Sequence, residues 1–234
     1  MARRYYFLLT SLPGLPVLGE TPPVELADFR RMAAEDAAAA GLIDALLLDH
    51  DLVLREAAMA GEIPAPTPAV LTREQARGEA PLPQFLSVEP AAARRIPADA
   101  IWEAYYRYVD RLAGQRRCDF ARRWVGFEVG LRNALVVARA AALKLDPQNY
   151  LVAEELALAE AGVDDVVAAW SEAPNPLAAL RVLDEGRWRW TQEHSQYFSF
   201  ALDELAAYAR RLILVSRWHV LAREEAGNTI SQDA

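Results

Sequence analysis

Asp49-His50-Asp51 is the densest group of potential metal ligands in the chain. Carboxylates and an imidazole are the side chains that bind zinc and similar ions. Consecutive residues of a helix point in different directions, so these three side chains cannot converge on one ion without help from another segment. We therefore predict no metal site here, and we expect Asp49 and Asp51 to face solvent or to pair with Arg55.

A second set of reactive types is His194, Ser195 and Asp184, the components of a serine–histidine–aspartate triad. Such a triad is defined by geometry, and no nucleophile-elbow sequence surrounds Ser195. The chain also has neither a GxxxxGK[ST] loop nor a GxGxxG loop for phosphate binding. We therefore predict no catalytic residue and no cofactor.

The segment Gly186-Arg187-Trp188-Arg189-Trp190 alternates arginine and tryptophan. This alternation suits base stacking or cation–π contacts. The competing interpretation is that the tryptophans enter the core while the arginines meet acidic neighbours. A protein interface anchored by Arg187, Trp188 and Trp190 is a third possibility. The net charge of −8 disfavours nucleic-acid binding, which needs broadly clustered positive charge, so we predict no nucleic-acid partner.

The composition is that of a protein with a sizeable core and a water-exposed surface. Hydrophobic residues make up 53% of the 234 residues and charged residues 25%. Cys118 is the single cysteine, which excludes a disulfide framework and fits a reducing compartment. No apolar run approaches the roughly 18 residues that a membrane span requires. We therefore expect a cytoplasmic protein with no direct membrane insertion.

Apolar periodicity predicts helices along most of the chain. An aromatic run at Tyr5–Leu9 is expected to be a strand or an extended segment. Seven of the 14 prolines lie between Pro64 and Pro97, which predicts a long connector packed over the surface through Leu82, Phe85, Leu86 and Val88. The expected helices are 24 onward, 42–60, 72–77, 98–113, 118–145, 148–161, 163–171, 176–185 and 199–225.

These elements predict an all-α fold, a compact multi-helix array with a short N-terminal extended segment and a proline-rich connector. The array is expected to be a single helical domain, residues 1–234, or two lobes, with 1–61 and the connector 62–97 preceding 98–234. Gly126 and Gly130 stand four residues apart on the longest central helix, and we expect a neighbouring helix to approach closely there.

Four segments together resemble an uncharacterised bacterial family whose genes lie in operons for V-type (archaeal-type) ATPases. Residues 4–13 resemble its start, a Tyr-Tyr-aliphatic run leading to Ser-Leu-Pro. Residues 46–52 resemble its early acidic helix and residues 127–139 its central helix. Residues 208–221, with Arg217-Trp218, resemble its C-terminal helix.

The resemblance implies a domain of unknown function that is distantly similar to the C/d-type ATPase subunit, a helical funnel joining the rotor stalk to the membrane ring. It implies a non-catalytic accessory or stalk-connecting subunit involved in ion transport, with V-type ATPase subunits as partners at the inner membrane. The candidate contact residues are Arg132, Asn133, Arg217 and Trp218. Packing and salt bridges within the chain are the alternative role for all four.

Another class of function stays open at this point. A small helical ligand-binding protein or enzyme could use buried carboxylates, for which Asp110, Asp119 and Glu128 are the candidates. A deep pocket lined by two or more of these groups would favour it.

Overall fold

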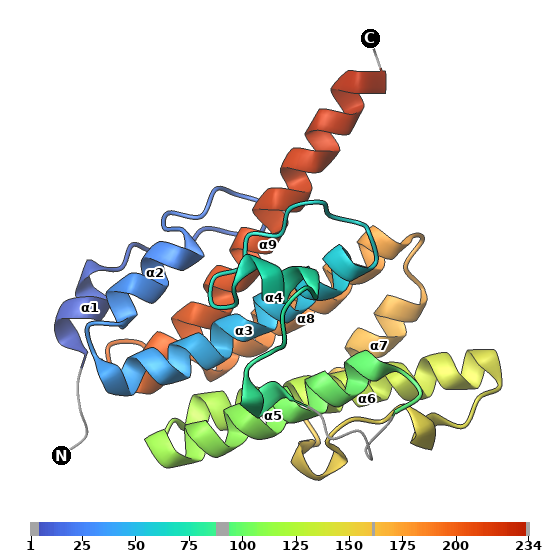
Figure 1. Ribbon diagram of the computed structural model, residues 1–234, viewed down its shortest axis with the longest axis horizontal. Helices are drawn as coiled ribbons and strands as arrows, with labels where there is room; N and C mark the ends of the chain where they lie inside the picture. Colours follow the sequence, from blue (N-terminus) through green and yellow to red (C-terminus); the bar gives the residue numbers. More distant parts are fainter. Residues whose placement is uncertain (1–4, 88–93, 161, 233–234) are drawn as a thin grey trace. The chain divides into compact units, whose positions relative to one another are not determined.

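The computed structural model describes residues 5–87, 94–160 and 162–232, and within these ranges it contains helices and no strand (Figure 1). The all-α prediction is confirmed. The chain divides into two compact units: unit 1 is 1–76 with 195–234, and unit 2 is 77–194. The two lobes expected from the sequence divide the chain differently, because the last helix belongs to unit 1 rather than to the second lobe.

Unit 1 is built around two long helices, α3 and α9, which pack along each other and against α2. Its helices are α1 (Tyr6–Ser11), α2 (Leu26–Ala33), α3 (Ala37–Met59), α4 (Arg73–Arg77, at the boundary between the units) and α9 (Leu202–Gln232). The core is aliphatic and is formed by Leu42, Ile43, Leu46, Leu205, Leu212 and Ile213, all fully buried.

The extended N-terminal segment predicted at Tyr5–Leu9 is wrong, since α1 is a short helix. Two contacts explain the difference. The Tyr5 N–H donates to the Phe200 carbonyl at 2.7 Å, which anchors the start of the segment on unit 1. The Thr10 hydroxyl donates to the Tyr6 carbonyl at 2.7 Å, within the helix itself. Neither partner can be identified from an aromatic run alone.

Helix α3 begins ahead of its predicted start at Leu42. The Asp36 carboxylate accepts hydrogen bonds from the Ala38 and Ala39 N–H groups at 2.8 and 3.1 Å and so caps the first turn. The alanine run that follows favours the helix enough to carry it through Gly41.

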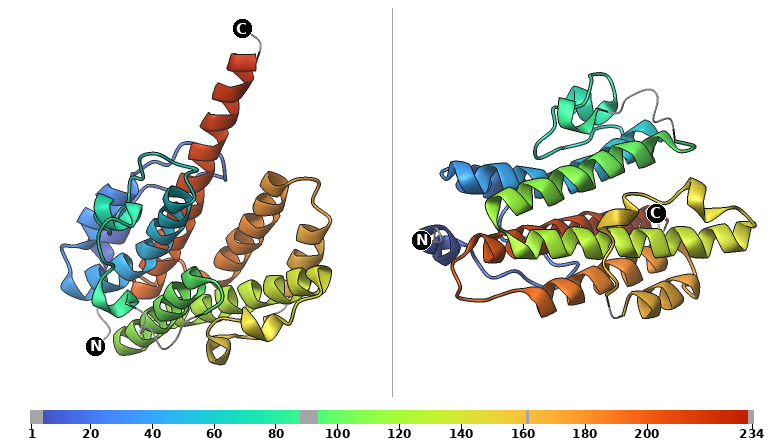
Figure 2. Two further views of the ribbon diagram at one scale, coloured as in Figure 1. Left: turned by 45° about the vertical axis from the view of Figure 1, so that its right-hand side comes forward. Right: turned by 90° about the horizontal axis from the view of Figure 1, so that it is seen from below.

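In unit 2 each main helix packs against the next in chain order, α5 on α6, α6 on α7 and α7 on α8. Figure 2 shows α5 and α6 as long neighbouring helices. The elements are η1 (Gln84–Leu86), α5 (Pro97–Arg116), α6 (Asp119–Leu143), η3 (Pro147–Asn149), η4 (Glu154–Leu156), α7 (Val163–Ser171) and α8 (Pro176–His194). The core is rich in aromatic residues and includes Trp102, Tyr105, Tyr106, Trp124 and Phe127.

The proline-rich connector packs on its neighbours as predicted. The Phe85 ring stacks on Tyr108 of α5 with 4.1 Å between centroids, and Leu86 is buried. The short helix expected near 72–77 is confirmed as α4. Val88, which was expected to pack with them, lies outside the described residues.

The helix predicted over 148–161 is wrong. In its place are two single turns, η3 and η4, followed by an extended strip up to Glu160. Side-chain and carbonyl groups of α6 form hydrogen bonds with backbone groups of this segment that a helix would pair internally. Asn133 accepts from the Val152 N–H at 3.0 Å and donates to the Val152 carbonyl at 2.9 Å. The Leu158 N–H donates to the Gly126 carbonyl at 3.0 Å.

The close approach predicted at Gly126 and Gly130 is confirmed, but the neighbour is this extended strip rather than a helix. A Cβ on Gly126 would meet the Leu158 side chain at 2.4 Å, and one on Gly130 would meet the Leu158 carbonyl oxygen at 2.9 Å. Both glycines therefore make room for the strip to lie on α6. Helix α7 has the predicted bounds, whereas α8 continues past Glu185 to His194.

Candidate functional site

The arginine of the Arg-Trp alternation is part of a buried ion cluster, which we name the Arg187 triad (Arg187, Glu128 and Asp184). The Arg187 Nε donates to both Glu128 oxygens at 3.1 and 2.9 Å, and its second terminal nitrogen lies 2.5 Å from Glu128 Oε1. Its other terminal nitrogen donates to Asp184 Oδ1 at 2.9 Å. Asp184 is fully buried, so the triad joins α6 to α8 away from water.

The tryptophans of the same segment point mainly inward. Trp190 is 4% exposed and stacks on Phe127 and on His194, with centroid separations of 4.8 and 4.2 Å. Trp188 is half-buried, and Arg189 is exposed. The interpretation in which tryptophan enters the core and arginine meets acidic neighbours is confirmed for Trp190 and Arg187. The aromatic partners of Trp190 thus belong to unit 2, as Trp190 itself does.

Arg132 and Asn133 of α6 also contact groups inside unit 2. The Arg132 guanidinium donates to Asp99 at 2.9 Å and lies over the Trp102 ring, 5.2 Å from its centroid. Asn133 holds the Val152 backbone through its two hydrogen bonds. Of the two roles weighed for these residues, intramolecular packing is the one that the structure displays.

The expectation that Asp49 and Asp51 face solvent or pair with Arg55 is wrong. Asp49 is buried and accepts from the Arg210 guanidinium at 3.1 Å, a bond between α3 and α9. Asp51 is fully buried and accepts from three consecutive backbone N–H groups, those of residues 69–71, each at 2.7 Å. Arg55 donates instead to the Gln75 carbonyl.

His50 lies between these two carboxylates in sequence and close to Arg210 and Arg217 in space. The pKa of its imidazole is lowered to about 4, mainly by burial and then by the positive charges of Arg217 and Arg210, which the negative charge of Asp49 partly opposes. Arg217 itself is half-buried and Trp218 beside it is buried in unit 1.

The His50 pKa makes a prediction about pH. The folded protein holds this imidazole neutral down to about pH 4, whereas the unfolded chain takes up a proton near 6.5. Stability is therefore fully present above pH 6.5 and is lost as the pH falls toward 4. Urea unfolding should show that His50→Gln removes about 2 kcal/mol of the loss that wild type suffers between pH 7.5 and 5. Equal losses in the two proteins would contradict the assignment.

The His194, Ser195 and Asp184 residues are not arranged as a triad. The His194 Nδ1 lies 2.8 Å from the Trp190 carbonyl oxygen, and its Nε2 lies 3.9 Å from Glu160. Asp184 bonds Arg187. Within the described ranges, no group of three or more His, Cys, Asp or Glu side chains is placed to hold a metal ion.

The buried carboxylates suggested for a ligand or catalytic site prove to be one rather than three. Glu128 is buried, but in the Arg187 triad. Asp110 is half-buried and lies 3.3 Å from Arg122 Nε, and Asp119 is exposed at the start of α6. The description of Asp110 and Asp119 as buried carboxylates is therefore wrong.

A group of exposed aromatic side chains on two neighbouring segments of unit 1 was not predicted from the sequence. We name it the aromatic patch and define it as Tyr6, Phe7, Tyr197 and Phe198. Phe7 is 82% exposed and Phe198 83%, while both tyrosines are about half exposed. The two segments are in contact, since the Tyr6 and Phe200 rings lie 4.3 Å apart. Sequence signals existed in the Tyr-Tyr-Phe and Tyr-Phe-Ser-Phe runs, but a run of aromatics more often marks a core.

The loop that displays Phe198 is braced by one carboxylate. Glu204, in the first turn of α9, accepts from the Phe198 and Phe200 N–H groups at 3.1 and 2.8 Å and from the Ser199 hydroxyl at 3.1 Å. Phe198 and Phe200 have φ values of +61° and +53°, a left-handed conformation that is costly for a residue with a Cβ. Arg211 holds Tyr197 by a 3.1 Å bond to its hydroxyl.

Comparisons of the chain with family models, curated protein sequences and solved structures return no match. The class that the fold itself defines is an all-α protein of two helical units. In the described part of the chain, no helix combines the length and the apolar character needed to cross a bilayer.

Proposed function

We propose that this protein is a non-catalytic accessory or stalk-connecting subunit associated with a V-type ATPase, and that it acts through protein–protein contacts made by the aromatic patch. The observation that carries the binding role is the presentation of Phe7 and Phe198, whose rings are more than four-fifths exposed. Exposed aromatic side chains on a rigid support are the usual anchors of protein interfaces.

The backbone geometry supports this role. A phenylalanine with φ of +61° costs about 1–2 kcal/mol relative to an ordinary conformation. Glu204 offsets that cost with three hydrogen bonds and keeps the Phe198 ring turned into water, where it gains nothing for folding. A conformation that is costly for folding and held in place by its surroundings is typical of binding and switch regions.

The choice of partner rests on the resemblance of four sequence segments to the family encoded with V-type ATPases. On this proposal the protein is cytoplasmic and peripheral to the inner membrane through the complex. The contact residues first considered, Arg132, Asn133 and Arg187, are engaged within unit 2, so the proposal assigns binding to the patch instead.

Affinity purification of the tagged protein from its own cells in mild detergent tests both the proposed partner and the proposed contact surface. Wild type should recover V-type ATPase subunits, and Phe7→Ser combined with Phe198→Gly should reduce that recovery at least tenfold, because loss of an anchor at an interface costs about 2 kcal/mol or more. Met59→Ser, which removes another exposed apolar side chain of unit 1, is the matched control.

The Phe198→Gly variant also separates binding from folding. Glycine adopts positive φ without steric cost, so the variant should unfold at the same or a higher urea concentration than wild type. Weaker recovery from a protein of undiminished stability supports the patch. Recovery of ATPase subunits that the patch variant leaves unchanged would contradict the patch, and no ATPase subunit from wild type would contradict the partner.

A further inference from the structure

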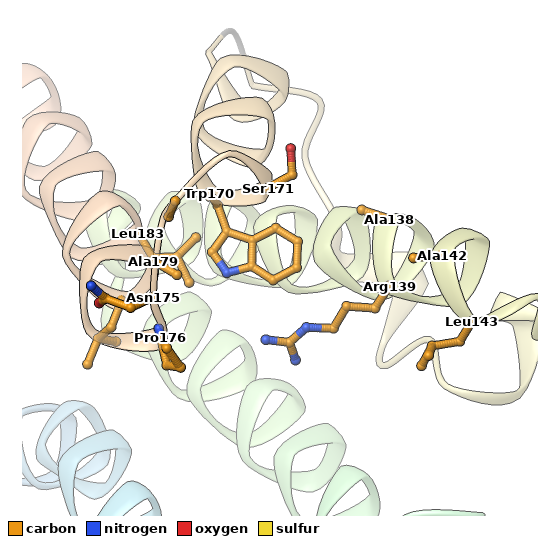
Figure 3. A pocket seen from close by; sticks show the side chains of 12 residues that line it. Ala138, Arg139, Ala142, Leu143, Trp170, Ser171, Asn175, Pro176, Ala179 and Leu183 are labelled. Carbon is orange, nitrogen blue, oxygen red and sulfur yellow. The ribbon is translucent and has the colours of Figure 1, made fainter.

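Unit 2 contains a groove between α6, α7 and α8 whose volume is about 730 Å³. This volume lies in the range of roughly 300–1,000 Å³ that is typical of small-molecule sites. Figure 3 shows the Arg139 guanidinium beside the Trp170 ring, with alanines and leucines around them. The apolar lining includes Ala138, Ala142, Leu143, Trp170, Ala179 and Leu183.

Among the described residues that line this groove, Arg139 is the one with a charged side chain. Its guanidinium lies over the Trp170 ring, 5.0 Å from the centroid. Arg132 and Arg187 of the same unit are each met by a carboxylate within 3 Å, whereas no carboxylate of the described residues lies within 4.0 Å of Arg139. The groove therefore combines an apolar wall with a positive charge that no acidic group of the described chain neutralises.

We propose that this groove binds a small apolar carboxylate, for which a medium-chain fatty acid is the simplest representative. Arg139 supplies the planar pair of N–H donors that a carboxylate takes up in bidentate fashion. The alkyl chain packs against Trp170 and the alanines of the lining. It also covers Leu143, which is 68% exposed at the end of α6. This site is independent of the aromatic patch and of the ATPase proposal.

Isothermal titration with decanoate, decanol and decyltrimethylammonium tests the charge requirement on the full-length protein. Decanoate should bind saturably, at one site, and at least tenfold more tightly than decanol, while the cation should bind more weakly still. Arg139→Gln should weaken decanoate about tenfold or more, to the level of decanol, and should leave decanol unchanged, because a charge-assisted hydrogen bond is lost.

Two further variants keep the test decisive. Ala142→Trp fills the groove from an exposed position of α6 and should abolish binding of both decanoate and decanol. Arg189→Gln removes an exposed arginine of α8 that does not line the groove and should leave both affinities unchanged. Circular dichroism establishes that each variant is folded. Equal affinities for decanoate and decanol, an unaffected Arg139→Gln protein, or no saturable binding would each overturn the proposal.

Discussion

Replacing Arg187 with methionine is expected to lower the free energy of unfolding by about 3–5 kcal/mol, measured by urea denaturation monitored through circular dichroism. The substitution leaves the Glu128 and Asp184 carboxylates buried without the guanidinium that bonds both of them. A buried charge whose partner has been removed keeps its desolvation cost and loses the compensating attraction. Methionine replaces the arginine stem as far as Nε, so the packing of the stem is largely kept.

A matched control lies on the same helix. Arg181 pairs with Glu185 at 2.9 Å, with both side chains about half exposed, and Arg181→Met should change stability by less than about 1 kcal/mol. A combined Arg187→Met, Glu128→Leu and Asp184→Leu protein should recover most of the lost stability, since it buries no charge. If the single Arg187→Met protein is as stable as wild type, Arg187 does not compensate the buried charges of Glu128 and Asp184.

Replacing Asp51 with alanine is expected to destabilise the protein by about 3–5 kcal/mol. This carboxylate is the acceptor for the N–H groups of residues 69–71, which belong to the turn before α4. A buried N–H group left without an acceptor costs about 1–3 kcal/mol, and the Leu71 N–H would be such a group. Ala69 and Val70 are half-buried, so water can partly replace the lost acceptor at their N–H groups. Because three N–H groups lose their acceptor at once, the loss of stability should exceed that of a buried polar residue with a single hydrogen bond.

The Asp51→Ala effect has a local signature as well. Hydrogen exchange at Ala69, Val70 and Leu71 should accelerate in the variant more than exchange at the core of α3, because these amides lose their acceptor. Asp28→Ala is the comparison, since Asp28 pairs with the exposed Arg31 within α2, away from the hydrogen bonds of that turn. A uniform acceleration across unit 1 would indicate a loss of packing rather than of this hydrogen-bonding role.

Local sequence patterns are sufficient to predict the helical class and the positions of most of the long helices. The reason is that helix signals are local: they lie in the side chains within a few residues of each turn, as at α7, where Gly162 precedes the helix and the bounds 163–171 were predicted. The same locality predicted that two glycines four residues apart on α6 admit a close neighbour, although it could not say which segment that neighbour would be.

The partners of the charged and aromatic residues, in contrast, depend on contacts between segments far apart in the sequence. Glu128 lies 59 residues from Arg187 and Asp49 lies 161 residues from Arg210, so no local spacing indicates either pair. The same holds for the strip after Val152, whose backbone groups bond α6 instead of forming the predicted helix. Phe7 reaches solvent from a segment that the Tyr5 N–H joins to the distant Phe200 carbonyl, and Glu204 fixes the Phe198 backbone from the first turn of α9. Arg139 meets Trp170 because α6 and α7 pack together. Long-range contacts of this kind decide which side chains a helical chain buries and which it presents.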